Sequence, residues 1–163
     1  MLKSFFSMLS IMFIASLVVG CAGSYTDVPG AERADPNGIY LVGIITDSSG
    51  YQDDLQSDLA KILHDNLQIE LAKPKYKQSS LKTYQINVNI TEFSTGNKVA
   101  NILLAPSGRI YIKADVSYTN TNGQTVGVMP LDVAWPPGWS KSGNIESVMS
   151  AVAEYIGFQA KKR

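Results

Sequence analysis

Cys21 is the residue whose type and position point most clearly to chemistry. It is the only cysteine of the chain, and it follows an apolar run that begins just after Lys3 and ends at Gly20. A basic residue, an unbroken apolar core and a small final residue form the layout of a secretory signal segment. A transmembrane helix is the alternative, but residues 5–20 are shorter than the roughly 20 apolar residues that a bilayer crossing needs. The layout therefore predicts a signal peptide over residues 1–20.

The segment Leu17-Val18-Val19-Gly20-Cys21 resembles the lipobox of bacterial lipoproteins. In that family a small residue at the cut site admits the peptidase, and the thiol of the next cysteine carries a diacylglycerol. The resemblance implies signal cleavage between Gly20 and Cys21 and a palmitate-bearing membrane anchor on Cys21. Ala22, in place of an aspartate, is similar to lipoproteins that are sent on to the outer membrane. The implied location is the periplasmic face of that membrane.

The cysteine count and the net charge argue against several kinds of site and partner. With one cysteine, the chain cannot form an intramolecular disulfide, and it offers no zinc or redox framework. A buried structural thiol is the other possible role for Cys21, but this residue lies far from any patterned core segment. The chain has 14 positive and 14 negative residues, and loss of Lys3 with the signal leaves 13 against 14. Because phosphate binding needs clustered positive charge, this balance argues against nucleic acid as a partner.

The other potentially reactive residues lack the partners that catalysis needs. His64, the only histidine, falls nearly opposite the buried stripe of a predicted helix, which favours a solvated position over a general base. Asp53, Asp54 and Asp58 fall in the first two turns of that helix, where its dipole favours carboxylates without any metal. No serine has nucleophile-elbow spacing, and no glycine pattern would cradle phosphate. These observations predict a non-catalytic protein without a metal or cofactor.

Trp135 and Trp139 are the candidate residues for binding a partner, because they flank a rigid Pro-Pro-Gly turn. Aromatic side chains on a stiff loop lose little entropy on contact, so an exposed loop of this kind would suit an envelope protein partner. In the alternative, both indoles cover the open end of the hydrophobic core, since large aromatics are mostly buried.

The first half of the chain predicts a tether, a strand and a helix. Residues 22–37 are poor in large aliphatics and rich in Gly, Pro, Asp and Ser, which predicts a mobile tether with a reach of about 22 Å. Residues 38–47 form a β-branched apolar run that predicts a central strand covered on both faces. A helix is predicted from Asp53, and Pro74 ends it. Its apolar stripe comprises Leu55, Leu59, Ile62, Leu63 and Ile69.

Three later segments alternate apolar and polar residues, which predicts strands with one face on the core and one in water. They cover residues 83–91, 109–119 and 125–134. Asn122-Gly123 predicts a hairpin between the last two. Pro130 predicts that the last strand lies at an edge or ends early, and residues 94–108 are expected to form a long connection.

Asn144 is predicted to cap a second helix. The apolar stripe of this helix comprises Ile145, Val148, Met149, Val152 and Ile156. The order strand-helix-strand-strand-strand-helix predicts a two-layer α+β sandwich, with two helices on one face of a small, mostly antiparallel sheet. This single domain is expected over residues 38–163, after the lipidated cysteine and tether of residues 21–37. The other face of the sheet should be polar, and it could accept a partner or simply be wet. Its predicted side chains are Gln85, Asn87, Asn89, Lys113, Asp115 and Ser117.

Over roughly residues 38–160 the chain resembles a family of bacterial envelope lipoproteins of unknown function, whose domain is similar to the amino-terminal domain of TolB and to the CsgG-type lipoproteins. The resemblance rests on the first strand, the Leu- and Asp-rich helix, the Asn-Gly hairpin and the closing helix. It also rests on the segment Ile90-Thr91-Glu92-Phe93-Ser94-Thr95-Gly96-Asn97 and on the strand after Ser107-Gly108-Arg109. Members often carry an arginine shortly after the Gly-Asn pair, where this chain has Asn101. The family implies periplasmic domains that dock onto other envelope components, and it implies no catalytic residues.

The expected function is therefore that of a lipid-anchored periplasmic binding or scaffolding lipoprotein. A subunit of an envelope secretion or conjugation complex is the first alternative. An enzyme acting on cell-wall glycans is the second, with Asp53, Asp54 or Glu92 as acid and base. It would need paired carboxylates on opposite sides of a cleft.

Overall fold

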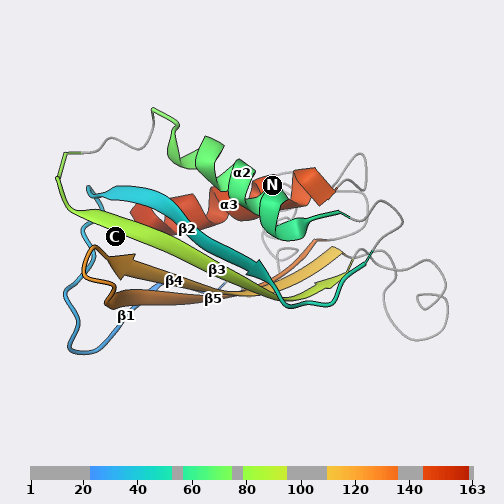
Figure 1. Cartoon of the computed structure of the whole chain (residues 1–163), viewed down its shortest axis with the longest axis horizontal. Helices are drawn as coiled ribbons and strands as arrows, with labels where there is room; N and C mark the ends of the chain where they lie inside the picture. The colour runs from blue at the N-terminus through green and yellow to red at the C-terminus, as the bar shows by residue number, and fades with distance from the viewer. Residues whose placement is uncertain (1–22, 53–56, 75–78, 95–109, 136–144, 162–163) are drawn as a thin grey trace, which may run out of the picture.

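One five-stranded sheet and two helices make up the part of the chain that the computed structural model describes, which is residues 23–52, 57–74, 79–94, 110–135 and 145–161. The strand order is β1-β5-β4-β3-β2, and both helices lie on the same side of the sheet (Figure 1). Only β2 and β3 pair in parallel; the other pairs are antiparallel. The predicted two-layer α+β sandwich is confirmed.

Three long antiparallel strands form the centre of the sheet: β3 (Thr83–Ser94), β4 (Ile110–Asn120) and β5 (Thr125–Trp135). Burial alternates along β3 and β4 as the apolar pattern predicted, because successive strand residues point to opposite faces. The inward side chains include Ile86, Ile90 and Ile112, none of which is accessible to solvent. The other face of β3 and β4 is polar and faces away from the helices.

The hairpin between β4 and β5 is the one that Asn122-Gly123 predicted. Gly123 has a φ of 76°, a left-handed conformation that glycine adopts without strain. The side-chain oxygen of Asn120 accepts hydrogen bonds from the amides of Asn122 and Gln124, both at 3.0 Å. The turn is thus held by local contacts that the sequence encodes directly.

Helix α2 (Leu59–Leu71) begins later than predicted. Its N-cap is Asp58, whose side chain accepts a hydrogen bond from the amide of Lys61 at 2.9 Å, and Asp53, Asp54 and Leu55 lie outside the described residues. Leu59 and Leu63 are fully buried as predicted, but Ile69 is 65% exposed. The reason is that the buried stripe runs through positions four apart, and it continues to Leu67 and Leu71.

Helix α3 (Ile145–Lys161) packs beside α2 and closes the core. Val148, Met149, Val152 and Ile156 are buried, which confirms the predicted stripe. The expected N-cap, Asn144, lies outside the described residues. Of the two helices described, neither is long and apolar enough to cross a bilayer.

Strand β2 (Ile39–Asp47) lies at the edge of the sheet, so the prediction of a central strand covered on both faces was wrong. Its inner face packs against the core through Tyr40, which is 3% exposed, whereas Leu41 and Ile44 are 49% and 72% exposed. A short apolar run does not by itself distinguish a strand buried on both faces from an edge strand with aliphatics in solvent. The parallel pairing with β3 follows from α2, which connects the two strands.

Residues 23–37 pack against the domain, which differs from the predicted free tether. They contain β1 (Thr26–Asp27), which pairs with β5, and Ala34, which is 2% exposed in the core. Tyr25 also packs against the core cluster. Composition suggested disorder, but backbone pairing to a sheet edge and a few buried side chains are enough to dock this segment. The prediction that Pro130 places its strand at an edge or ends it early was wrong, because β5 lies between β1 and β4 and continues to Trp135. The two residues of β1 pair with Gly127 and Val128, so Pro130 itself has no partner on that side in the described residues.

Candidate functional site

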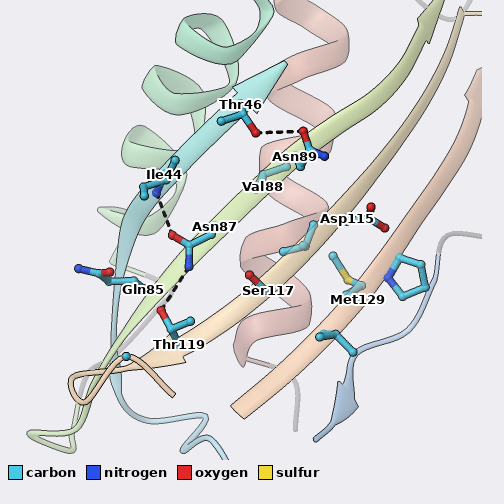
Figure 2. Close-up of a pocket in the computed structure, with 14 residues that line it drawn as sticks. Ile44, Thr46, Gln85, Asn87, Val88, Asn89, Asp115, Ser117, Thr119 and Met129 are labelled. Carbon is cyan, nitrogen blue, oxygen red and sulfur yellow. Dashed lines mark hydrogen bonds between the residues drawn. The ribbon is translucent and has the colours of Figure 1, made fainter. Parts of the chain in front are cut away.

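The candidate site is a shallow groove of about 780 Å³ on the outer face of the sheet, opposite the helices (Figure 2). All four long strands contribute to it. Amide, hydroxyl and carboxylate groups from β3 and β4 occupy its centre, and residues of β2 and β5 form its two sides. Its lining residues are Ile44, Thr46, Gln85, Asn87, Val88, Asn89, Asp115, Val116, Ser117, Thr119, Gly123, Val128, Met129 and Pro130.

Asn87 connects three strands across the middle of this face. Its side-chain oxygen accepts a hydrogen bond from the backbone amide of Ile44 at 2.9 Å, and its side-chain nitrogen donates to the hydroxyl of Thr119 at 3.2 Å (Figure 2). The β2–β3 pairing shifts register between Val42 and Ile45, so this amide lies where the ladder is interrupted. Asn87 replaces the missing ladder partner and couples β2 to β4.

Gly43 makes that arrangement possible. A Cβ at this position would lie 2.2 Å from the side-chain oxygen of Asn87, well inside contact distance. A glycine inside a strand often marks a bulge or a close approach of another group. The signal for this part of the site is therefore present in the sequence, as a glycine in one strand and an asparagine on the exposed side of another.

Asn89 fixes the β2 side of the groove in a second way. Its side-chain oxygen accepts hydrogen bonds from the hydroxyls of Thr46 and Ser48, both at 2.9 Å. The hydroxyl of Ser48 also lies 3.1 Å from the carbonyl oxygen of Ile90. These contacts hold the end of β2 on β3. The side-chain oxygen of Asn89 is occupied by these two hydrogen bonds.

Three polar side chains of the groove remain available to a partner. Within the described residues, no side-chain hydrogen bond involves Gln85, Asp115 or Ser117, all of which lie on the outer face as predicted. Exposed aliphatics border them, with Ile44 on the β2 side and the 40% exposed Val128 on the β5 side. The groove can thus offer hydrogen-bond donors and acceptors between two apolar margins.

Glu92, named above as a possible acid or base, lies on the charged end of the same face. Its carboxylate is 3.1 Å from the ammonium of Lys113, and the two side chains are 56% and 38% exposed. Tyr111 and, after it, Glu92 raise the pKa of Lys113. Glu92 is therefore an exposed ion-pair partner. Glycan hydrolysis would instead need two carboxylates on opposite sides of a cleft.

The other residues that the sequence analysis singled out are not found among the described residues of this groove. His64 lies on α2, on the other layer, with 40% of its side chain exposed and its ring 3.4 Å from Asp65. In the ranges that the structure describes, no three His, Cys, Asp or Glu side chains gather in a way that could hold a metal ion. Trp135 is the last residue of β5, but its side chain, Trp139, Gly20 and Cys21 lie outside the described residues.

Replacing Asn87 with alanine should loosen β2 locally. The amide of Ile44 would lose its partner, and one net hydrogen bond is worth about 1 kcal/mol. We expect hydrogen exchange at the Ile44 amide to accelerate several-fold, up to about tenfold. Amide exchange followed by NMR measures this rate. Asn89→Ala is the matched control, because Asn89 bonds the hydroxyls of Thr46 and Ser48 rather than this amide. Equal acceleration in both variants would contradict the assignment.

Comparison with known proteins supplies the family and the fold. A variant of PelC from Paraburkholderia phytofirmans, solved as a dodecamer, matches with a TM-score of 0.50 and 14% identity, over 86% of this chain and 99% of that one. A second PelC dodecamer from Paraburkholderia phytofirmans matches with a TM-score of 0.47, 14% identity and coverage of 85% and 96%. A candidate lipoprotein from Caulobacter crescentus CB15 has a TM-score of 0.43, 16% identity and coverage of 78% and 89%.

At 14% identity, the match with a TM-score of 0.50 shows a shared fold alone. No curated protein matches the chain. The family model described as "Domain of unknown function (DUF4410)" matches residues 27–134, which is more than half of the chain. That match runs from the second residue of β1 to the last but one residue of β5, and it includes every described residue that lines the outer groove. This chain therefore belongs to the DUF4410 family.

Proposed function

We propose that this protein is a lipid-anchored binding module on the periplasmic face of the bacterial outer membrane. Cys21 is the lipidated residue in this proposal, and the outer face of the sheet is the surface that binds an envelope protein. The anchor is supported by the signal layout and by the lipobox-like segment that ends at Cys21. Two acyl chains or more give stable anchoring, at about 0.8 kcal/mol per buried methylene.

The observation that carries the binding role is the outer groove, which no described helix or strand covers. Both helices cover the opposite face, so the core does not depend on anything docking here. The groove nevertheless places Gln85, Asp115 and Ser117 between the exposed aliphatics Ile44 and Val128. Protein interfaces combine apolar contact with about one hydrogen bond per 100–200 Å². A surface of this composition suits a protein partner.

We propose that this role involves no catalysis. Supporting this, the position of Glu92 is that of an exposed ion-pair partner of Lys113, and His64 lies on the other layer of the sandwich. Among the described residues that line the groove, Asp115 has the only carboxylate, whereas acid–base hydrolysis of a glycan would need two.

A second candidate function is that of a subunit in a larger envelope assembly. Its support is the edge strand β2, on which Leu41 and Ile44 are 49% and 72% exposed. Edges of this kind pair readily with other chains. The PelC variant that matches with a TM-score of 0.50 is a dodecamer, which makes self-assembly the first form of this candidate to test.

In vivo photocrosslinking distinguishes the two functions. A photoreactive amino acid at Ser117 reports the groove, one at Leu41 reports the β2 side, and one at Gln68 on α2 serves as the exposed control. We expect position 117 to give a crosslinked band with one other envelope protein, identified by mass spectrometry, and position 68 to give none. Adducts between copies of this chain from position 41 would favour the assembly. Equal labelling at 117 and 68 would contradict a binding role for the groove.

A further inference from the structure

The described chain contacts the folded domain from its first residue, Gly23. The carbonyl oxygen of Gly23 accepts a hydrogen bond from the hydroxyl of Tyr155 on α3 at 3.1 Å. On its other side Gly23 lies against β5 so closely that a Cβ would be 1.6 Å from the carbonyl oxygen of Pro130. The chain is therefore clamped between α3 and β5 at Gly23.

The residues after Gly23 continue this docking without a gap. The Tyr25 hydroxyl donates to the carbonyl oxygen of Val126 at 3.2 Å, and its ring meets Tyr118 edge-on at 5.1 Å. Gly127 leaves the space for that ring, since a Cβ there would lie 2.0 Å from it. β1 then pairs along β5, with Thr26 opposite Val128. Tyr25 and β1 thus hold the segment along β5.

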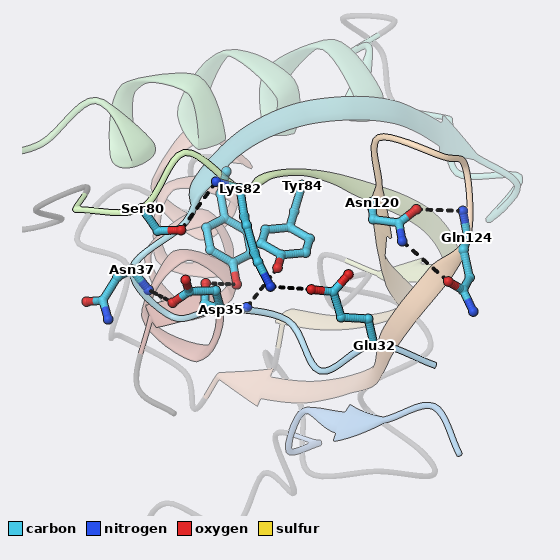
Figure 3. A network of polar contacts seen from close by, with 9 residues as sticks. Glu32, Asp35, Asn37, Ser80, Lys82, Tyr84, Asn120 and Gln124 are labelled. Atoms are coloured by element: carbon cyan, nitrogen blue, oxygen red, sulfur yellow. Dashed lines mark hydrogen bonds and ion pairs between the residues drawn. The ribbon is translucent and has the colours of Figure 1, made fainter. Parts of the chain in front are cut away.

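The far end of the segment is held by a polar network (Figure 3). The amide of Asp35 donates to the Tyr84 hydroxyl at 3.0 Å, and Lys82 forms an ion pair with Glu32. The amide of Asn37 donates to the Asp35 carboxylate at 2.8 Å and lowers the pKa of that carboxyl. Both ends of residues 23–37 are thus attached to the sheet, and the segment does not act as a spacer.

Cys21 is two residues before Gly23, and two extended residues span at most about 7 Å. We propose that the β5 edge of the domain, around Gly23, Val128 and Pro130, faces the lipid surface at close range and in one orientation. This inference rests on the proposed lipidation of Cys21. The β2 edge then points away from the bilayer, since three strand spacings of about 4.8 Å separate it from β5.

The chemistry of this edge is compatible with a lipid headgroup surface. Val128 and Pro130 are exposed and uncharged, and the mature chain is close to neutral, with 13 positive and 14 negative residues. Such a net charge gives no strong overall attraction to anionic lipid that would orient the domain. The short connection between Cys21 and Gly23 orients the domain instead. In this orientation the groove stays accessible from the periplasm.

Fluorescence quenching in vesicles tests this orientation. The native cysteine is acylated in the proposed mature protein, so Val128→Cys and Ile44→Cys each add a single reactive thiol for a dye. Both positions line the outer groove, Ile44 on the edge strand β2 and Val128 on β5, which only the two-residue β1 borders on its other side. The lipidated full chain is reconstituted into phosphatidylethanolamine and phosphatidylglycerol vesicles with a nitroxide on the headgroup. We expect several-fold stronger quenching at position 128 than at position 44.

A second variant inserts a flexible Gly-Ser segment between Ala22 and Gly23, which lengthens the connection without touching the fold. Quenching at positions 128 and 44 should then become similar and weak. Equal quenching at both positions of the chain without the insertion would overturn the orientation, whether both are strong or both are weak. Failure of the chain to float with the vesicles would instead overturn the lipid anchor, and the two failures are therefore distinguishable.

Discussion

Replacing Tyr84 with alanine is expected to lower the free energy of unfolding by about 3–5 kcal/mol, as for other buried aromatics. Tyr84 is 2% exposed, and its ring stacks on that of Tyr40 with centroids 5.2 Å apart. Its hydroxyl also accepts the hydrogen bond from the Asp35 amide (Figure 3). The variant would therefore lose core packing and release the segment that precedes β2.

Urea unfolding followed by circular dichroism measures this loss. Tyr84→Phe keeps the ring and removes only the acceptor for Asp35, so it should cost about 1 kcal/mol. Tyr111→Ala is the matched control on the outer face, where the tyrosine is only partly buried, and its effect should be clearly smaller. A Tyr84→Ala chain as stable as the Tyr111→Ala chain would contradict the packing of Tyr84 in the core.

Replacing Cys21 with alanine is expected to abolish palmitate incorporation completely. The proposed acyl chains attach through the thiol of Cys21, and the chain has no other cysteine. The lipobox resemblance also implies that cleavage requires this cysteine, so the variant should keep its leader and migrate as a longer precursor. Growth with labelled palmitate, followed by immunoprecipitation and electrophoresis, measures both effects.

Ser24→Ala is the control for the Cys21 variant, because Ser24 lies outside the lipobox-like segment and is exposed. This chain should incorporate label and be processed like the unmodified protein. Label that persists in the Cys21→Ala chain would place the acyl group on another residue. Absence of label from the unmodified protein would end the proposal of a lipid anchor.

The layers of the fold were predictable because they depend on local periodicity. Alternation along β3 and β4 marks which side chains are buried, and the stripe of α3 does the same at helical spacing. Strand neighbours were not predictable in this way. The apolar run of β2 is compatible with a central or an edge position, and only the pairing of distant segments places it at the edge.

Contacts between distant residues explain the other differences. Residues 23–37 have the composition of a tether, yet Tyr25 docks on Val126, which is 101 positions away. In the groove, the outward polar face of β3 and β4 was predicted, but the bond from the Ile44 amide to Asn87 spans 43 positions and depends on the bulge in β2. Gly43 is the local signal that could have indicated that close approach.

The central claim, an anchored binding module, is tested most directly by mass spectrometry of the amino-terminal peptide of the protein purified from its native membrane. We predict a peptide that begins at Cys21 and carries a diacylglycerol on its sulfur, followed by Ala22 and Gly23. A peptide that begins at Met1, or a Cys21 that carries an unmodified thiol, would contradict the account.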